Sequence, residues 1–416
     1  MRSAERPNIL FVTSHWPHAP KYGAQQRALN IGRLLTRCGH VSLIVASADE
    51  PDAETLRKTG DEFDLRAVMP LEPHAITAGE RLRCELDPRF MNTHYRVASP
   101  EARHAMLRAV DAHDIVWIFG LHEANAFGIY HWPHTILDID DVQSRAYTAR
   151  ARAESNLFTK LLNHRMAMIW RRRERRLIER FDVVTVCSED DRRYLGGGAA
   201  IRVVPNGFTA PATVPIRSPQ TPPRFGFIGL CDYGPNRDGV DWFTDAVWPI
   251  IKRALPDARL RLAGRGSEAA LSAAPDVDVL GYVDNAADEI AGWTAMIVPI
   301  RFGGGTRVKI AEAFSRCCPV VSTSLGAVGY DTAEQCLLLG DEPATFAAAC
   351  IQLAMDPSLG RRLASSGWRE FTRKWTWDAI EASVGDCVRL CIERSGAMRS
   401  ARSRVAATRT DACSAT

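Results

Sequence analysis

The sequence lacks the features that mark disulfide-rich, metal-binding or membrane-spanning proteins. Its 416 residues include 11 cysteines, but they are scattered, and no Cys-x-x-Cys pair or Cys/His cluster has the spacing of a zinc site. Long apolar runs are missing too, because the first run, within residues 8–13, has only about five apolar residues and is too short for a signal peptide or a membrane span. We therefore expect reduced thiols and a cytoplasmic protein.

A strong net charge and a dinucleotide fingerprint are also absent. The formal net charge is only +3, so no overall field attracts nucleic acid, and we expect no such partner. Gly264-Arg265-Gly266 follows an apolar run, but no complete Gly-x-Gly-x-x-Gly follows any predicted strand. This disfavours an oxidoreductase of the Rossmann type, and we expect neither a cofactor nor a metal.

Apolar periodicity indicates two similar halves. Short apolar runs alternate with helical patterns, which is typical of parallel α/β domains. The first half opens with a strand, a helix and a strand at residues 8–13, 24–38 and 41–47. The second half repeats this plan at residues 224–230, 239–254 and 259–264. Further strands are expected at 114–120, 134–140, 182–188, 276–282, 295–300 and 319–324.

Composition then suggests the domain boundaries. Residues 209–223 are rich in Pro, Ser and Thr, as interdomain linkers are. A chain of this length exceeds the size at which one core keeps growing. We therefore predict two Rossmann-like domains, at residues 1–208 and 224–375. Residues 397–416 contain almost no large apolar side chain, and we expect them to be disordered.

The most informative segment is residues 299–323, which reads as strand end, glycine loop, amphipathic helix and strand. Gly303, Gly304 and Gly305 allow backbone N–H groups to approach a ligand with no Cβ in the way. We expect the helix to begin at about Thr306, where its free N–H donors and the positive end of its dipole favour a phosphate. The alternative is a tight turn between two elements.

Charged side chains surround this loop. Arg301, Arg307 and Lys309 bring three cations to it, and Arg307 is the leading phosphate ligand because a guanidinium makes two parallel contacts. Glu312 lies roughly two turns into the helix, where its carboxylate can accept hydrogen bonds from the vicinal hydroxyls of a ribose. Together these groups suit a nucleoside diphosphate.

This segment resembles the retaining glycosyltransferases of family 4. In that family a Glu, seven residues and a second Glu precede a small–Pro–Val–Val run. Glu312-Ala313-Phe314 and Pro319-Val320-Val321 match the second half of the pattern, whereas Gly304 stands where the first Glu belongs. The loop is similar to the GGGTR variant of the family. The resemblance implies a GT-B fold, in which two Rossmann-like domains face each other across a cleft and residues 376–396 return to the first domain.

The resemblance also implies roles for residues of the first domain. Leu121-His122-Glu123-Ala124 follows the strand at 114–120, where the family often has His-Glu-Pro with the His near the donor sugar. A His beyond the carboxyl end of a parallel strand points to the ligand edge, although it can instead cap the next helix. Gly23 corresponds to a loop near the diphosphate and acceptor. Asp140, or its neighbour Asp141, is an acceptor-side carboxylate or an N-cap.

A phosphate-binding Arg is missing from the second domain. Many relatives have Gly-Arg where this chain has Gly229-Leu230. Arg237 or one of the three loop cations is expected to replace it. No metal is implied by the resemblance.

A basic segment is a further candidate surface. Residues 165–180 carry seven arginines among apolar side chains. Such a helix can lie on anionic lipid, or it can be a solvated helix face. Lipid-linked or saccharide acceptors are both compatible with the resemblance.

We therefore predict an enzyme that transfers a sugar from a nucleotide diphosphate to a hydroxyl acceptor with retention, in polysaccharide or glycolipid assembly. Two alternatives remain open. One is a GT-B epimerase or hydrolase. The other is a catalytically weak nucleotide-sugar-binding scaffold subunit, which the absence of the first Glu at Gly304 motivates.

Overall fold

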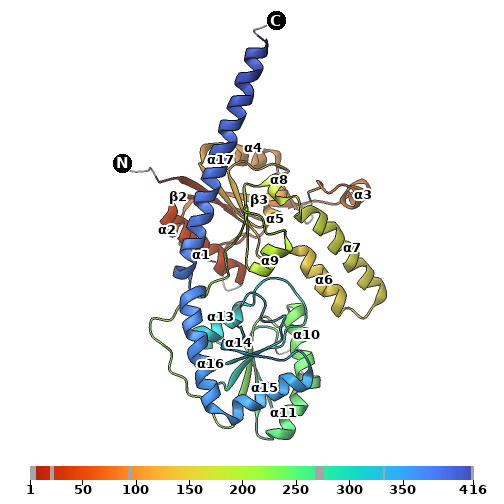
Figure 1. Cartoon of the computed structure of the whole chain (residues 1–416), viewed down its shortest axis with the longest axis vertical. Coiled ribbons are helices and arrows are strands. Elements are labelled where there is room, and N and C mark those ends of the chain that lie inside the picture. Colours follow the sequence, from red (N-terminus) through yellow and green to blue (C-terminus); the bar gives the residue numbers. More distant parts are fainter. Residues whose placement is uncertain (1–5, 19–22, 92–95, 268–275, 331–332, 414–416) are drawn as a thin grey trace. The chain divides into compact units, whose positions relative to one another are not determined.

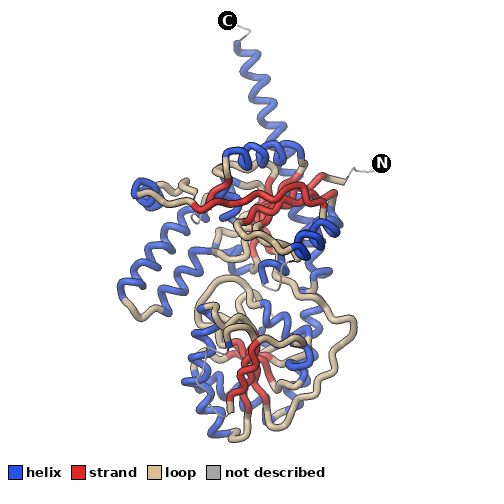
Figure 2. The backbone as a smooth tube through the Cα atoms, turned by 180° about the vertical axis from the view of Figure 1, so that it is seen from behind, coloured by secondary structure: helices blue, strands red, loops and turns tan. Residues whose placement is uncertain are grey.

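The computed structural model describes residues 6–18, 23–91, 96–267, 276–330 and 333–413. Contacts within the chain define two compact units, each with strands at its centre and helices around them (Figures 1 and 2). The N-terminal unit comprises Met1–Ser144, Arg165–Val204 and Glu381–Thr416. The C-terminal unit comprises Arg145–His164 and Pro205–Ile380.

The N-terminal unit is built on an eight-stranded sheet with the order β4-β3-β2-β1-β5-β6-β7-β8. Its strands pair in parallel except for β3 and β4, which are antiparallel. Central strands such as β1 and β5 are buried on both faces, which explains their continuous apolar sequences. The strands are β1 Asn8–Thr13, β2 His40–Ser47, β3 Asp64–Pro73, β4 Arg96–Ala98, β5 Ile115–Phe119, β6 Thr135–Asp138, β7 Val183–Val186 and β8 Ile201–Val203.

Helices connect these strands. Several begin at side-chain caps, as at Asp52, Thr77 and Ser99, whose oxygens accept backbone N–H groups of the first turn. The helices are α1 Gly23–Cys38, α2 Ala53–Glu62, α3 Ala78–Leu86, α4 Pro100–Ala112, α5 Leu121–Ala126, α6 Gln143–Ala153, α7 Leu157–Glu174, α8 Leu177–Arg180 and α9 Glu189–Tyr194.

The C-terminal unit has a six-stranded parallel sheet with the order β11-β10-β9-β12-β13-β14. Its strands are β9 Arg224–Ile228, β10 Arg259–Ala263, β11 Val277–Gly281, β12 Ala295–Val298, β13 Val320–Ser322 and β14 Leu338–Leu339. Its helices are α10 Gly234–Trp242, α11 Trp248–Ala254, α12 Ala286–Ala291, α13 Val308–Ser315, α14 Ala333–Cys336, α15 Pro343–Met355 and α16 Pro357–Glu370, with π-helical turns η1 Phe243–Val247 and η3 Phe371–Trp375. Helix α17, Trp377–Cys413, ends the described chain.

The C-terminal sheet follows the doubly wound order 3-2-1-4-5-6, and the N-terminal sheet has the same order if β4 is set aside and β8 is counted as a seventh strand at the other edge. In this order the chain direction across the sheet reverses between the first and fourth strands. Loops leaving those two strands diverge and expose backbone for a ligand. In the C-terminal unit these loops follow β9 and β12, and in the N-terminal unit they follow β1 and β5.

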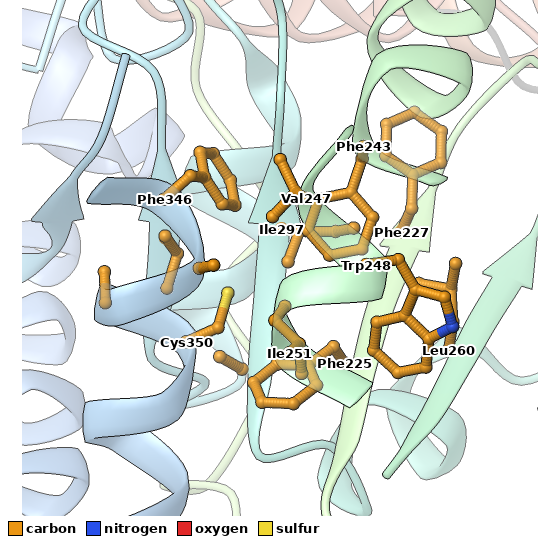
Figure 3. Packing of buried hydrophobic residues seen from close by; sticks show 14 of the residues in the cluster. Phe225, Phe227, Phe243, Val247, Trp248, Ile251, Leu260, Ile297, Phe346 and Cys350 are labelled. Carbon is orange, nitrogen blue, oxygen red and sulfur yellow. The ribbon is translucent and has the colours of Figure 1, made fainter. Parts of the chain in front are cut away.

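Aromatic side chains fill one face of the C-terminal sheet (Figure 3). Phe225 and Phe227 on β9 pack with Phe243 and Trp248, and Phe346 of α15 meets Phe243 with ring centroids 5.7 Å apart. Five large rings buried together remove several hundred Å² of apolar surface from water, so this cluster is a main source of stability for the unit.

The opposite face of β9 has no room for a side chain at one position. A Cβ placed on Gly226 would lie 2.1 Å from the Trp293 indole, which is fully buried there. The indole Nε1 donates to Glu289 Oε1 at 2.7 Å. The glycine therefore allows a tryptophan to pack directly on the backbone of the central strand.

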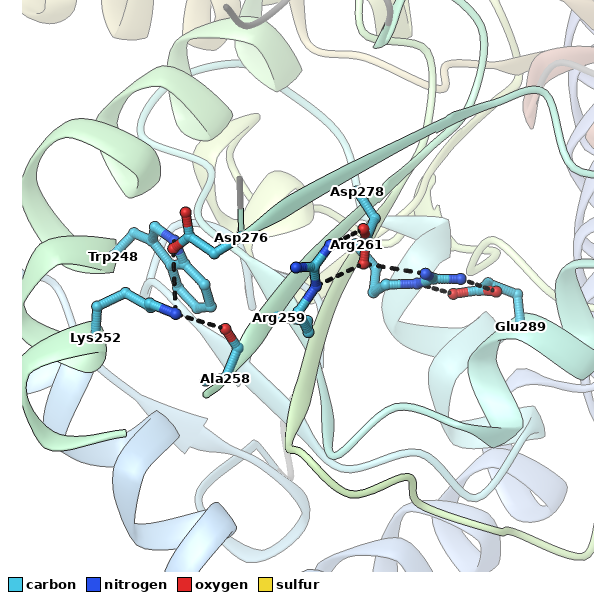
Figure 4. Close-up of polar contacts among 8 residues, drawn as sticks. All are labelled: Trp248, Lys252, Ala258, Arg259, Arg261, Asp276, Asp278 and Glu289. Atoms are coloured by element: carbon cyan, nitrogen blue, oxygen red, sulfur yellow. Dashed lines mark hydrogen bonds and ion pairs between the residues drawn. The ribbon is translucent and has the colours of Figure 1, made fainter. Parts of the chain in front are cut away.

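A charged network fastens the edge of this sheet (Figure 4). Arg261 on β10 donates to both oxygens of Glu289 at 2.7 Å and to Asp278 on β11 at 3.1 Å. Arg259 also pairs with Asp278. These bonds hold the pKa of the Asp278 carboxyl below its ordinary value. The network ties strands β10 and β11 to α12.

The structure confirms the predicted α/β class and the parallel strands of both halves, and it corrects several details. The helix expected over 239–254 begins at Gly234 and is interrupted by η1. The basic segment 165–180 is divided between α7 and α8. Residues 397–413, expected to be disordered, continue α17. Ala and Arg have high intrinsic helix propensity, which explains this last difference.

Candidate functional site

The glycine loop leaves β12 at the switch point of the C-terminal sheet. Gly303 has a φ of +118° and Gly305 a φ of +66°, conformations that other residues rarely adopt. A Cβ on Gly303 would also lie 3.1 Å from the Arg307 guanidinium. Helix α13 begins at Val308, two residues later than predicted, with Arg307 as its N-cap residue. The loop therefore presents backbone N–H groups at the start of a helix, as expected.

Arg307 stabilises the loop itself. Its guanidinium donates to the carbonyl oxygens of Gly304 and Gly305, within the loop that it follows. Its own carbonyl accepts a 2.8 Å hydrogen bond from the Tyr330 hydroxyl. Thr306 Oγ1 accepts from the Asn206 amide at 3.0 Å. These contacts fix the shape of the loop and give Arg307 a positioning role that the sequence did not reveal.

Lys309 is the desolvated cation of the site. Its Nζ donates to Asn236 Oδ1 at 2.9 Å and lies 3.8 Å from the centroid of the Phe227 ring. Burial, with a smaller contribution from Arg307, lowers the pKa of Lys309 to about 7. Among the described residues, no carboxylate lies within ion-pair distance of it. Gly229 leaves room for this arrangement, because a Cβ there would lie 3.1 Å from Nζ.

Glu312 lies one turn further along α13 and is half-buried. Burial raises the pKa of its carboxyl, and Arg316 and Lys309 partly oppose this rise. Within the described part of the chain, no hydrogen bond to its carboxylate oxygens is present. A carboxylate in this setting is available for hydroxyl donors of a ligand.

The remaining two candidate cations are paired with acids. Arg301 forms a two-point contact with Asp238, with Nη2 at 2.6 Å from Oδ1, and lies over the Trp242 ring. Arg237 is partly exposed and lies 3.8 Å from Asp232. Their charge at the loop is therefore already offset, in contrast to that of Lys309.

In the N-terminal unit, His122 lies in the first turn of α5, directly after β5. Its ring meets Trp170 edge-on with centroids 5.5 Å apart. The preceding Gly120 has a φ of +103°, and the neighbouring Glu123 accepts a 2.6 Å hydrogen bond from Ser14 in the loop after β1. The loops after β1 and β5 thus meet at the switch point of this sheet.

The structure also places two other predicted site residues of this unit, Gly23 and Asp140. Gly23 is the exposed first residue of α1, rather than a loop residue, and residues 19–22 lie outside the described chain. Asp140 follows β6, and its Oδ1 accepts from the Cys187 thiol at 3.2 Å.

Arg27, on α1, is a core residue and does not lie on the helix surface. Arg27 is 1% exposed and Asp138 is fully buried. The guanidinium contacts the carboxylate at 2.7 and 3.2 Å and also donates to the carbonyl of Val204. Thr185 donates to the same carboxylate at 2.7 Å. This is a core ion pair with satisfied partners.

Within the described residues, no group of three His, Cys, Asp or Glu side chains could hold a metal, and no helix is long and apolar enough to cross a membrane.

Comparisons with known proteins bear on this arrangement. Residues 222–356, which contain β9 and the glycine loop, match the family model of the group 1 glycosyl transferases. The fold matches a sucrose-phosphate synthase from Thermosynechococcus elongatus with a TM-score of 0.63 at 16% identity, covering 92% of this chain and 98% of the other. It also matches HepE from Anabaena, solved with UDP-glucose, with a TM-score of 0.61 at 14% identity, covering 92% and 99%.

The chain has the GT-B fold, and its segment 222–356 matches the group 1 glycosyl transferases. A protein of the cps region of Klebsiella pneumoniae, described as uncharacterized, is 24% identical over 80% of this chain and 88% of its own length. The glycine loop belongs to the matched family segment, whereas His122 lies outside it.

Proposed function

We propose that this glycosyltransferase moves a sugar from a nucleoside diphosphate to a hydroxyl acceptor with retention at the anomeric carbon. The observation that carries the proposal is that one helix presents both a desolvated Lys309 ammonium and a Glu312 carboxylate to which no described group donates a hydrogen bond. A diphosphate supplies the negative charge that Lys309 lacks, and a ribose supplies hydroxyl donors for Glu312.

In this proposal the loop stabilises the leaving diphosphate. Lys309 and the N–H groups at the start of α13 face the charge that develops on the phosphate as the glycosidic bond breaks. Arg307 acts through the loop, since its guanidinium contacts the carbonyls of Gly304 and Gly305. His122 orients the sugar, and the departing phosphate accepts the proton of the acceptor hydroxyl.

Relatives support a uridine nucleotide and a saccharide product. HepE is solved with UDP-glucose, and the Klebsiella relative is encoded in a cps region. We therefore propose a role in polysaccharide or glycolipid assembly, with a nucleotide sugar as donor and no cofactor or metal. Cytoplasmic localisation belongs to the same proposal.

The surface of α7 and α8 supports a peripheral membrane contact. Arg171, Arg172 and Arg175 are exposed there, and Met168 and Ile178 are 61% and 51% exposed. Basic and apolar side chains together bind anionic lipid at about 1 kcal/mol per basic residue. The other arginines of 165–180 are less available. Arg173 and Arg180 are buried, and Arg165 and Arg176 form ion pairs with acidic residues, which limits the contact to this exposed subset.

A scaffold role remains the second candidate, because Gly304 replaces the first Glu of the family pattern. The two roles differ in one measurement: a scaffold binds the donor but transfers nothing. An epimerase or hydrolase would consume the donor without an acceptor.

The deciding experiment is a thermal-shift and calorimetric screen against nucleotide sugars, beginning with UDP-glucose. A ligand at 100 times its Kd stabilises a protein by about 2.7 kcal/mol. Lys309→Met should weaken binding at least about tenfold, the expected loss for one charge-assisted contact. Arg307→Ala should weaken it by a similar factor, because the loop loses the guanidinium that holds its shape. Arg237→Ala is the matched control, because Arg237 is exposed beside Asp232, and should change affinity less. The reverse ranking would move the phosphate site to the loop after β9.

A further inference from the structure

A second cluster of cations lies in the N-terminal unit, outside the glycine loop. A small cavity there is lined by Arg89, Arg173, Arg176 and Arg180. Aromatic side chains, including Trp170 and Tyr130, make up much of the remaining lining, and none of the described lining residues is acidic. Four guanidinium groups around one space repel one another unless an anion separates them.

Arg173 is the central member of this cluster. It is 6% exposed, and its Nη2 donates to the carbonyl of Cys84 at 2.8 Å. Its Nε and Nη1 are buried and have no hydrogen-bond partner among the described residues. No carboxylate of the described chain forms an ion pair with it. Burying an unpaired guanidinium costs several kcal/mol, so such a group calls for a partner.

Arg180 repeats this pattern beside it. It is also 6% exposed, and its hydrogen bonds go to neutral groups, the carbonyl of Tyr130 at 3.0 Å and Asn125 Oδ1 at 2.8 Å. Burial lowers the pKa of Arg180 to about 10. No carboxylate of the described chain lies within ion-pair distance of this guanidinium either.

Further donors lie around the same space. Trp170 Nε1 and the Tyr130 hydroxyl are buried without a partner in the described structure. Arg89 is exposed at the cavity, and Arg176 is half-buried and contacts Glu179 at 3.1 Å. Two buried and two more accessible arginines therefore converge with two aromatic donors.

The size of the cavity limits what enters. Its interior volume is about 10 Å³, which is room for one water-sized group. One water molecule can satisfy two or three of these donors, but it leaves both buried charges uncompensated. An oxygen of an oxyanion fills the same volume and brings negative charge, while the rest of the anion stays near Arg89 and Arg176.

We propose that this arginine cavity binds a phosphate group carried by the acceptor of the transfer reaction. A phosphate with two negative charges matches two buried guanidinium groups better than a singly charged carboxylate does. Trp170 lines the cavity and also contacts His122 edge-on. The phosphate therefore binds beside Trp170, whose ring also contacts the residue proposed to orient the sugar. Only the identification of the phosphate carrier as the acceptor rests on the proposed function.

The test is calorimetric titration of the full chain with inorganic phosphate and with glycerol 3-phosphate, at constant ionic strength against chloride. Lys309→Met is introduced first, so that the glycine loop does not compete for phosphate. Arg173→Met then removes the charge and keeps the packing of the side-chain stem. Arg172→Met is the matched control, because Arg172 is an exposed neighbour on α7.

We expect the Lys309→Met chain and its Arg172→Met derivative to bind glycerol 3-phosphate equally, and the Arg173→Met derivative to bind at least about tenfold more weakly. Without phosphate, Arg173→Met should leave Tm unchanged or raise it, because it removes an uncompensated buried charge. Binding unaffected by Arg173→Met would overturn the proposal. So would a lower Tm of that variant without phosphate, since the guanidinium would then be satisfied within the fold.

Two further results identify the source of the ligand. If the chain binds inorganic phosphate but not glycerol 3-phosphate, the ligand is a free ion and the acceptor assignment is overturned. If it binds acetate but neither phosphate compound, the ligand is a carboxylate and the phosphate proposal is overturned. Failure of the proposed function is separate. Arg173→Met alone should keep the parent's affinity for UDP-glucose, and absence of nucleotide binding in every chain would refute the donor site while leaving this cavity standing.

Discussion

The N-terminal unit contains two kinds of buried arginine. Arg27 meets Asp138 in a two-point ion pair that Thr185 completes. Arg173 and Arg180 are almost as deeply buried, yet their described partners are neutral groups. The same side chain, at similar depth, is fully compensated in one place and uncompensated in another.

This difference separates a structural charge from a charge that awaits a ligand. A compensated pair holds α1, β6 and the end of β8 together, because Arg27 also donates to Val204. An uncompensated cation is retained at a cost to stability, which selection accepts where binding repays it. Lys309 and Glu312 in the C-terminal unit are likewise charged groups that no described ion pair compensates.

The strongest way to break this comparison is to disrupt the compensated pair. Arg27→Met leaves Asp138 buried without its cation and should lower the free energy of unfolding by about 3–5 kcal/mol. Urea denaturation followed by circular dichroism measures this. The double variant Arg27→Met/Asp138→Leu should recover a large part of the loss. A single variant as stable as the parent would show that the pair is not structural.

The second prediction concerns Glu312. Glu312→Ala should abolish detectable donor binding, a loss of at least about a hundredfold, because hydrogen bonds to a charged group contribute about 1.5–3 kcal/mol each and a ribose makes two. The melting temperature should change little, since no described group bonds to this carboxylate. Calorimetry with UDP-glucose and a thermal melt measure both quantities. Parent-like binding would remove the ribose assignment.

The third prediction concerns His122, which is proposed to orient the donor sugar. His122→Ala should lower kcat by about tenfold or more while donor affinity stays near the parent value, because a contact made mainly in the transition state appears in kcat. Steady-state kinetics alongside Tm separates this from a structural role. If kcat per folded molecule is unchanged and Tm falls, His122 is not part of the site.

The smallest expected effect is the pH dependence of Lys309. Burial lowers the pKa of Lys309 to about 7 in the free chain, whereas the unfolded chain keeps the ordinary value of 10.5. The unfolded state therefore binds more protons between pH 7 and 10.5, and this group makes stability rise with pH in that window. A diphosphate favours the charged form, so donor affinity should fall about fivefold from pH 7 to 8. Calorimetry should detect proton uptake on binding at pH 8, and Lys309→Met should remove it.

Local patterns predicted the fold well. Apolar strands and helical spacing located β1, β2, β5, β9 and β12, because these strands are largely buried and read as nearly continuous apolar runs, and located β10, where buried apolar residues alternate with arginines. The short edge strands β4, β8 and β14 were missed, since two or three residues carry no periodicity. β3 was missed because it is largely exposed and alternates with polar residues.

The proximity of the candidate site residues could be predicted where one segment contains them. Gly303 to Gly305, Lys309 and Glu312 are close in sequence, so their proximity follows from one turn and one helix. Pairings across long separations were not predictable. Arg27 and Asp138 are 111 residues apart, and Asn236 reaches Lys309 across 73. A single sequence gives no signal for such contacts, and the arginine cavity was missed for the same reason.

The packing of Trp293 on Gly226 restricts which substitutions these two positions can accept during evolution. Any side chain at 226 would strike the indole, and the indole in turn holds Glu289, which binds Arg261 at the sheet edge. Gly226 can therefore be replaced by a larger residue only where Trp293 has been replaced by a smaller one. Among diverging descendants, the two columns should covary, and an alanine at 226 should mark lineages whose tryptophan has already been lost.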